Sequence, residues 1–79
     1  MKETLINLIK NNELLSCCIE LEKLGFEVKD IKSVILKWDL FKAHLENMKK
    51  KFTSEQYNDY NEALDRITSQ LVNIILTNF

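Results

Sequence analysis

Residues 30–50 read DIKSVILKWDLFKAHLENMKK, and this stretch decides the fold. Its apolar residues step alternately by four and three positions, the spacing that places side chains on one face of an α-helix. The members of this first stripe are Val34, Trp38, Phe41, Leu45, Met48 and, just beyond the stretch, Phe52. A second stripe, on another side, consists of Leu36, Leu40 and Ala43. So broad an apolar surface predicts a long helix over residues 30–50 that contacts more than one neighbouring helix.

A second long helix is predicted directly after the first. Thr53-Ser54-Glu55-Gln56 matches the capping box, in which the Thr53 side chain caps the helix and Gln56 reaches back. The helix is expected to run to about Thr77, and its apolar stripe is Tyr57, Tyr60, Leu64, Ile67, Leu71 and Ile74. Because only residues 51–53 connect the two helices, we expect them to run antiparallel. Their stripes would then pack together over six layers, a contact that we call the seam.

Two shorter helices are predicted at the N-terminus, over residues 2–10 and 13–24. Asn12 is a competent N-cap for the second of them. Gly25 then supplies the left-handed residue that commonly ends a helix. The expected fold is all-α: a single domain over residues 1–79 and a small antiparallel helical bundle. In it, a short N-terminal helical hairpin packs on a long C-terminal helical hairpin.

The composition agrees with helices and narrows the classes of partner. The chain has no proline and one glycine, whereas strands would need clusters of turn residues between them. Lys plus Arg is 11 and Asp plus Glu is 12, which gives a formal net charge of -1. Because nucleic-acid-binding domains are normally clearly basic, we expect no nucleic-acid partner.

Cysteine usage and hydropathy favour a cytoplasmic location. Cys17 and Cys18 are neighbours, and neighbours on a helix point about 100° apart, so a disulfide between them is implausible. We interpret both as small apolar residues in a reducing compartment. Met1 begins a polar segment, which does not resemble a signal peptide. The longest apolar run, residues 71–76, is too short to span a bilayer, so no membrane partner is expected.

No group of residues predicts catalysis or metal binding. His44 is the only histidine; it stands next to Leu45, at the edge of the predicted buried face, and no Cys or His accompanies it at ligand spacing. The two cysteines lack the Cys-x-x-Cys spacing of redox or metal pairs. Aromatic residues at helical spacing are ordinarily core rather than a ligand pocket, and here they are Trp38, Phe41, Tyr57 and Tyr60. We therefore predict a non-enzymatic protein without catalytic residues, metal or cofactor.

Charged residues supply the candidate interaction surface. The basic concentration is Lys42, Lys49, Lys50 and Lys51. In the last turn of the helix predicted over 30–50, these cations would complement the helix dipole; the functional alternative is a docking patch. Two acidic sets are its possible complements: Glu20, Glu22, Glu27 and Asp30 around the end of the second helix, and Glu55, Asp59, Glu62 and Asp65 along the fourth. Separate acidic and basic surfaces allow identical or related copies to associate head to tail.

One enzyme hypothesis remains as an alternative. Residues 61–65, Asn-Glu-Ala-Leu-Asp, resemble the Ser-Gln-Glu-Leu-Asp signature of small helical-hairpin aspartyl-phosphate phosphatases. The serine and the glutamine are absent here, and that glutamine would help to position the attacking water. Leu64 is also explained as a seam residue, and Asp65 as its solvated neighbour.

The order of elements resembles a known family. A short helical hairpin precedes a long helix with an apolar-aromatic segment (residues 35–41), a basic stretch (49–51), a polar cap (54–58) and an Asn-rich amphipathic helix (61–75). This arrangement is similar to the effector-associated domain, specifically the eleventh in that series of bacterial modules of the Death-like class, over nearly the whole chain. The family usually has a glycine in the connection where this chain has Lys49-Lys50-Lys51-Phe52. Its Asn-Arg-Ile element is not cleanly present around residues 61–67.

The resemblance implies a protein-interaction adaptor. In such modules, matching copies on different proteins associate and bring a sensor to an effector, such as a protease or an NTPase, in bacterial immunity or conflict systems. No catalytic residues carry over, because the family works through its surfaces. The alternative is a stand-alone small helical regulator, from a phage or mobile element, that binds and occludes a host protein. The phosphatase is the third hypothesis.

Overall fold

Four helices contain most of the chain in the computed structural model, which describes all 79 residues. They are α1 (Lys2–Lys10), α2 (Leu14–Lys23), α3 (Lys29–Asn47) and α4 (Ser54–Asn78). No β-strand is present, so the predicted all-α fold is confirmed and each predicted helix is found. None of the helices combines the length and the hydropathy that crossing a bilayer requires.

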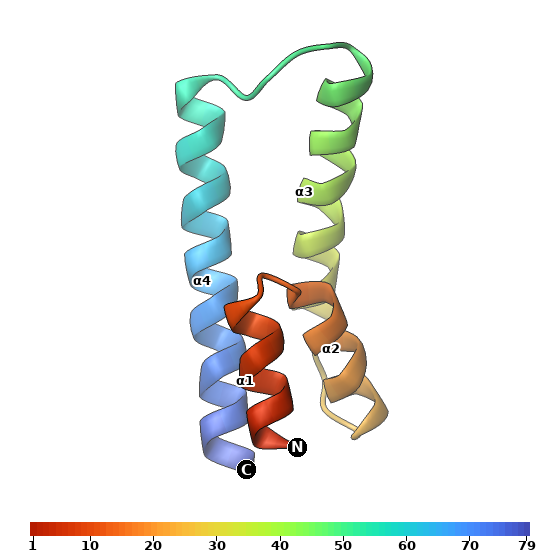
Figure 1. Cartoon of the computed structure of the whole chain (residues 1–79), viewed down its shortest axis with the longest axis vertical. Coiled ribbons are helices and arrows are strands. Elements are labelled where there is room, and N and C mark those ends of the chain that lie inside the picture. Colours follow the sequence, from red (N-terminus) through yellow and green to blue (C-terminus); the bar gives the residue numbers. More distant parts are fainter.

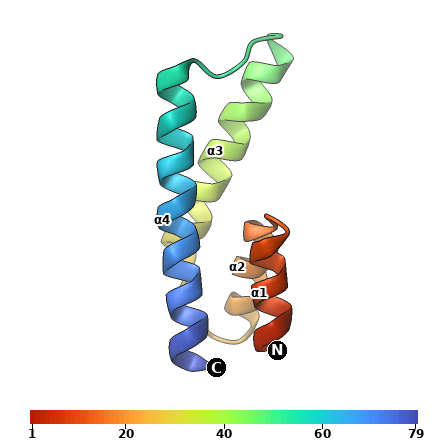
Figure 2. The ribbon, with the colours of Figure 1, turned by 60° about the vertical axis from the view of Figure 1, so that its left-hand side comes forward.

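The helices form two antiparallel hairpins of unequal length. The α3–α4 hairpin is long, and the short α1–α2 hairpin packs against its lower half (Figure 1). α1 contacts α2 and α4, whereas α2 contacts α1 and α3. Figure 2 shows the short hairpin on one side of the long one, with both termini at the same end. We call this end the base and the end with the 48–53 connector the tip; the molecule measures 41 × 20 × 20 Å.

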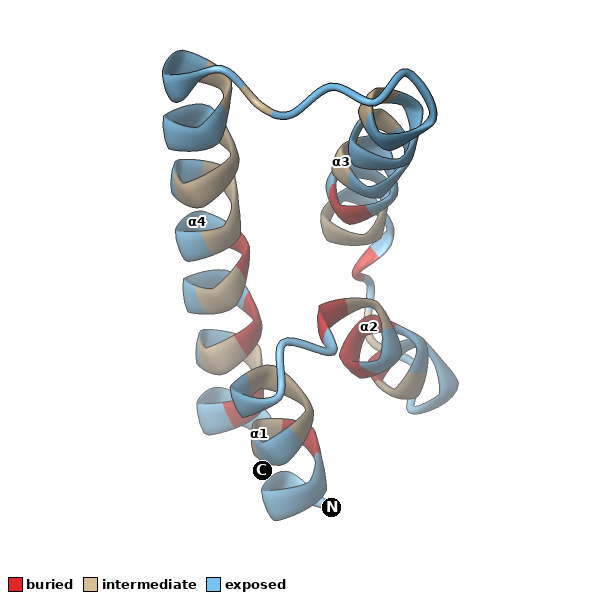
Figure 3. Ribbon diagram, turned by 45° about the horizontal axis from the view of Figure 1, so that its top comes forward, coloured by how far each residue is buried: buried red, intermediate tan, exposed pale blue.

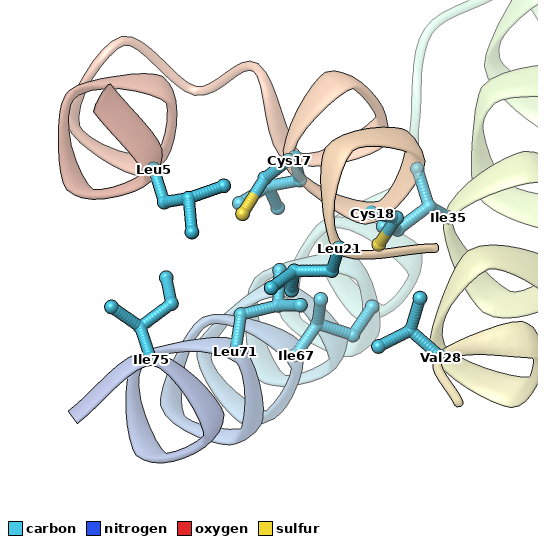
Figure 4. Packing of buried hydrophobic residues seen from close by; sticks show 10 residues of the cluster. Leu5, Cys17, Cys18, Leu21, Val28, Ile35, Ile67, Leu71 and Ile75 are labelled. Carbon is cyan, nitrogen blue, oxygen red and sulfur yellow. The ribbon is translucent and has the colours of Figure 1, made fainter. Parts of the chain in front are cut away.

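The buried core lies in the base half of the molecule. Figure 3 shows buried residues on all four helices and none at the tip. Figure 4 shows the side chains of α1 and α2 meeting those of α4 and the start of α3. The cluster holds ten apolar residues and no buried polar side chain: Leu5, Leu14, Cys17, Cys18, Leu21, Val28, Ile35, Ile67, Leu71 and Ile75.

The prediction of a six-layer seam between α3 and α4 is wrong. Ile35 rather than Val34 is buried on α3, and Ile75 rather than Ile74 on α4, because α2 and α1 cover those sides. Val34 is 38% exposed. Toward the tip, Met48 is 48% and Tyr57 is 55% exposed. A connection of six residues, longer than the predicted three, lets the ends of the two helices stand apart (Figure 1).

Aromatic rings make the contacts between α3 and α4 near the tip. The Trp38 ring lies 5.5 Å from Tyr60 and 6.2 Å from Phe52, both in edge-to-face geometry. Phe52 also stacks on Phe41 at 5.7 Å. We call Trp38, Phe41, Phe52 and Tyr60 the aromatic cluster; its members are half-buried. Rings of this size hold the two helices apart, whereas smaller side chains would let them approach.

The second stripe of α3 has no helix against it, contrary to the prediction. Leu36 and Ala43 are exposed, and Leu40 is 71% exposed. α2 and α4 cover the opposite side of α3, where Ile31, Ile35 and the aromatic cluster lie. The Leu36–Leu40–Ala43 stripe therefore faces outward, away from the rest of the bundle.

Three helices end in the same left-handed cap. Asn12, Gly25 and Lys49 have φ values of 60°, 92° and 56°. After each one, a backbone N–H donates to a carbonyl five residues earlier: Glu13 to Leu8, Phe26 to Leu21, and Lys50 to Leu45. This is the Schellman motif, which satisfies carbonyls at a helix end. The Gly25 prediction is confirmed. The Asn12 prediction is wrong, because Asn12 closes α1 and Glu13 is the N-cap residue of α2.

The start of α4 matches its prediction. The Thr53 N–H donates to Gln56 Oε1 at 3.0 Å, and the Gln56 N–H donates to Thr53 Oγ1 at 3.1 Å. This complete capping box stabilises the start of α4 through local contacts that do not depend on α3.

Candidate interaction surfaces

The tip gathers the predicted basic residues, although not where the sequence placed them. α3 ends at Asn47, so Lys49, Lys50 and Lys51 lie in the connector beyond the helix and not in its last turn. Lys42, on α3, lines the same small depression of about 140 Å³ as Lys50 and Lys51. All four lysines are exposed, and none has a carboxylate within 4.0 Å, since the only ion pairs are Lys23–Glu20 and Lys32–Glu22. The structure therefore brings Lys42, Lys50 and Lys51 together around one depression, which Glu46 also lines, and Lys49 precedes Lys50 in the connector. We call these four unpaired lysines the basic patch.

The first acidic set divides into paired and unpaired groups. Glu20 pairs with Lys23 at 3.2 Å, and Glu22 pairs with Lys32 at 2.9 Å, which links α2 to α3. Exposed pairs of this kind contribute about 0–1 kcal/mol each. Glu27 and Asp30 make no ion pair; Glu27 Oε1 only accepts the Lys29 N–H at 3.3 Å. Glu27 and Asp30 are thus the members of this set that remain free for a cationic partner.

A groove that the sequence did not predict lies beside these two carboxylates. It has a volume of about 500 Å³ and runs between the base half of α3 and α4. Its apolar lining consists of Val28, Ile31, Val34, Ala63, Ile67 and Ile74. Glu27 and Asp30 stand on the α3 side, and Arg66, Gln70 and Asn73 on the α4 side. The signal for it was the pair Val34-Ile35, since two neighbours on a helix cannot both face the same partner.

The second acidic set lies along the tip half of α4. Glu55, Asp59, Glu62 and Asp65 are all exposed, and none has an ion pair. Glu55, in the first turn, also interacts favourably with the positive end of the helix dipole. The spacings of four, three and three place all four on one side of the helix. These four carboxylates thus form an exposed acidic face along the tip half of α4.

Both cysteines belong to the core, as predicted. They are free thiols without exposed surface, and Figure 4 shows both sulfur atoms directed into the buried cluster. Burial raises the pKa of the Cys17 thiol. Burial also raises the pKa of Cys18 to about 11, and the neighbouring Cys17 adds to that shift. At neutral pH both remain thiols, the form that is neither a nucleophile nor a metal ligand.

The other residues considered for chemistry are dispersed. His44 is exposed in the last turn of α3, so its predicted place at the edge of a buried face is wrong. No three His, Cys, Asp or Glu side chains lie close enough together to hold a metal ion. In the phosphatase-like segment, Leu64 packs against the core, whereas Asp65 is exposed and unpaired.

The predicted aromatic group is partly correct. Trp38, Phe41 and Tyr60 do cluster, but the exposed Tyr57 ring is not among them, and Phe52 takes the fourth place. A shallow hollow of about 360 Å³ lies on the outer side of this cluster, lined by Lys37, Trp38, Phe41 and Gln56. The rings thus pack against each other on one side and remain accessible on the other.

Comparison with protein-family models, with curated proteins and with solved structures gives no match to this chain.

Proposed function

We propose that this chain is a non-enzymatic protein-interaction adaptor whose copies associate head to tail. One observation carries the proposal: unpaired lysines gather at the tip, while the unpaired carboxylates Glu27 and Asp30 lie in the base half, beside an apolar groove. The tip carries mainly lysines and the groove mainly carboxylates, so charge favours tip-to-base contact over tip-to-tip contact. The two thiols are buried, and no three His, Cys, Asp or Glu side chains are placed to hold a metal ion.

The wider role is part of the same proposal. We propose that association of matching modules couples a sensor to an effector, such as a protease or an NTPase, in bacterial immunity, within the cytoplasm. Its support is the resemblance to the effector-associated domain, carried by the apolar-aromatic segment 35–41 and the basic stretch 49–51. The tip geometry adds to this support. Lys49 occupies a left-handed position that suits glycine, the residue the family usually has in this connection.

The test is the concentration dependence of molecular mass, measured by sedimentation at low and at high salt. The charge-reversed variant Lys50→Glu/Lys51→Glu should lose self-association. The wild type should lose it as salt rises from about 0.1 M to 1 M, where the screening length falls from about 10 Å to about 3 Å. The matched control is Lys2→Glu/Lys10→Glu, which makes the same charge change at exposed positions of α1. If neither high salt nor the tip variant weakens self-association, the contact is not driven by charge.

A second candidate function has one specific observation in its favour. The outward Leu36–Leu40–Ala43 stripe is an apolar surface without an intramolecular partner, as expected for a small regulator that covers an unlike protein. Phage or mobile-element neighbours of the gene would support the regulator, whereas a neighbouring or fused protease or NTPase would support the adaptor. The phosphatase, in contrast, requires loss of phosphoryl-aspartate from a response regulator when the protein is added.

A further inference from the structure

We infer that the groove between α3 and α4 receives the tip of a second copy of this chain, an inference that rests on the proposed head-to-tail association. The apolar lining of the groove is open to solvent at Val34, which is 38% exposed. The groove volume of about 500 Å³ lies within the size range of ligand-binding clefts. A complementary occupant must therefore carry an apolar side chain that is itself exposed.

The tip offers such a side chain. Met48 is 48% exposed at the end of α3, and its flexible thioether chain fits irregular apolar surfaces. The apolar stripe at Leu40 is also exposed, but Met48 is followed directly in the chain by three unpaired lysines. Met48 is thus an exposed apolar residue next in the chain to the basic patch.

The charges around Met48 complement those around the groove. Lys49, Lys50 and Lys51 follow Met48 and match the unpaired carboxylates Glu27 and Asp30 on the α3 wall. Glu46 precedes Met48 and matches Arg66 on the opposite wall, and neither of these two has an ion pair within the chain. Both signs of charge are therefore paired when Met48 is seated on the lining. A groove with only one sign would give no such orientation.

The partner must be another molecule. Val34 lies on α3 and Met48 caps the end of the same helix, 14 positions later, which corresponds to about 20 Å at 1.5 Å per residue. The tip of a molecule therefore cannot reach its own groove. Every copy presents one tip and one groove, so the contact is heterologous and continues from copy to copy.

Charge-neutralising variants test whether the tip and the groove are two different surfaces of one contact. The tip variant Lys50→Gln/Lys51→Gln keeps its groove, and the groove variant Glu27→Gln/Asp30→Asn keeps its tip. The side-chain amide oxygen that this variant carries at position 27 can still accept the Lys29 N–H. In sedimentation, each variant alone should self-associate at least about tenfold more weakly than the wild type. In an equimolar mixture, the intact tip of the groove variant should bind the intact groove of the tip variant. The resulting one-to-one complex should grow no further, because its remaining tip and groove are the altered ones.

The outcomes separate the inference from the proposed function. If both variants self-associate as the wild type does, the groove contact is wrong, although self-association itself stands. If the wild type stays monomeric to about 1 mM, both the inference and the proposed association fail. Leu40→Glu is the control outside the groove and should associate normally. If it dissociates while the groove variant does not, the Leu36–Leu40–Ala43 stripe is the contact and the inference is overturned.

A crosslink gives an independent readout. Met48→Cys and Val34→Cys, mixed under mild oxidation, should form a disulfide-linked heterodimer faster than either variant links to itself. The native Cys17 and Cys18 are buried and do not compete. Equal rates in the mixture and in the single variants would contradict the placement of Met48 against Val34.

Discussion

The base and the tip of this molecule are built differently from the same two long helices. In the base, α1 and α2 cover the long hairpin, and the ten buried residues lie there. Toward the tip, four half-buried aromatic rings are the main contact between α3 and α4. Burial of apolar area is the dominant stabilising term in so small a domain. The base therefore supplies most of the stability. The tip contributes little apolar burial, so charged residues can gather there at low cost in stability.

The largest effect is expected from a cavity in the base. Leu71→Ala removes a side chain with 0% exposure from the centre of the cluster and should lower the free energy of unfolding by about 2–5 kcal/mol. The control is Leu40→Ala at the 71% exposed position, where the change should stay within about 0.5 kcal/mol. Urea unfolding followed by circular dichroism measures both. Similar losses for the two variants would show that Leu40 is covered in solution.

A smaller effect is expected in the aromatic cluster. Trp38→Ala removes the ring that meets Phe41, Phe52 and Tyr60, and because the site is half-buried, the loss should be about 2 kcal/mol. Trp38 is also the only tryptophan, so its fluorescence reports on the tip half. In the wild type, the fluorescence change should precede the loss of helical dichroism as urea rises. Coincident transitions would show that tip and base unfold as one unit.

The buried thiols make base stability depend on alkaline pH. The pKa of Cys18 is about 11 in the folded chain, against an ordinary value of 9.0. The folded state therefore holds this proton more tightly than the unfolded state. The stabilisation is complete below pH 9 and falls as pH rises to 11, by at most about 1.4 kcal/mol per pH unit. Cys18→Ala should flatten the profile measured by urea unfolding, and an unchanged slope would assign the pH dependence to other groups.

The smallest effect is expected at the left-handed residue of the tip. Lys49→Gly relieves a φ of 56°, and it should raise the free energy of unfolding by about 0.5–1 kcal/mol. Lys50→Gly, at the next position, where φ is not positive, should give no gain. Differential thermal melting of the two variants checks the sign. If Lys49→Gly and Lys50→Gly lower the free energy of unfolding equally, the left-handed cap does not persist in solution.

The sequence by itself determined the local features of this protein. The four helices, the Gly25 cap and the Thr53–Gln56 capping box were all predicted, because each depends on residues within about one turn of each other. The core character of the adjacent cysteines also followed from their spacing and apolar surroundings. Of the predicted interaction surface, Lys42, Lys50 and Lys51 line one depression at the tip.

Only the tertiary structure decided which of several apolar faces is covered. Periodicity places Val34 and Ile35 on overlapping apolar stripes of one helix. Either residue could be the buried one as far as local spacing is concerned. α2 packs on the Ile35 side, which leaves Val34 to line a groove and Leu40 in solvent. The same packing pairs Glu22 with Lys32 and leaves Glu27 and Asp30 unpaired. Such choices depend on contacts between residues far apart in the chain, and local spacing carries no information about them.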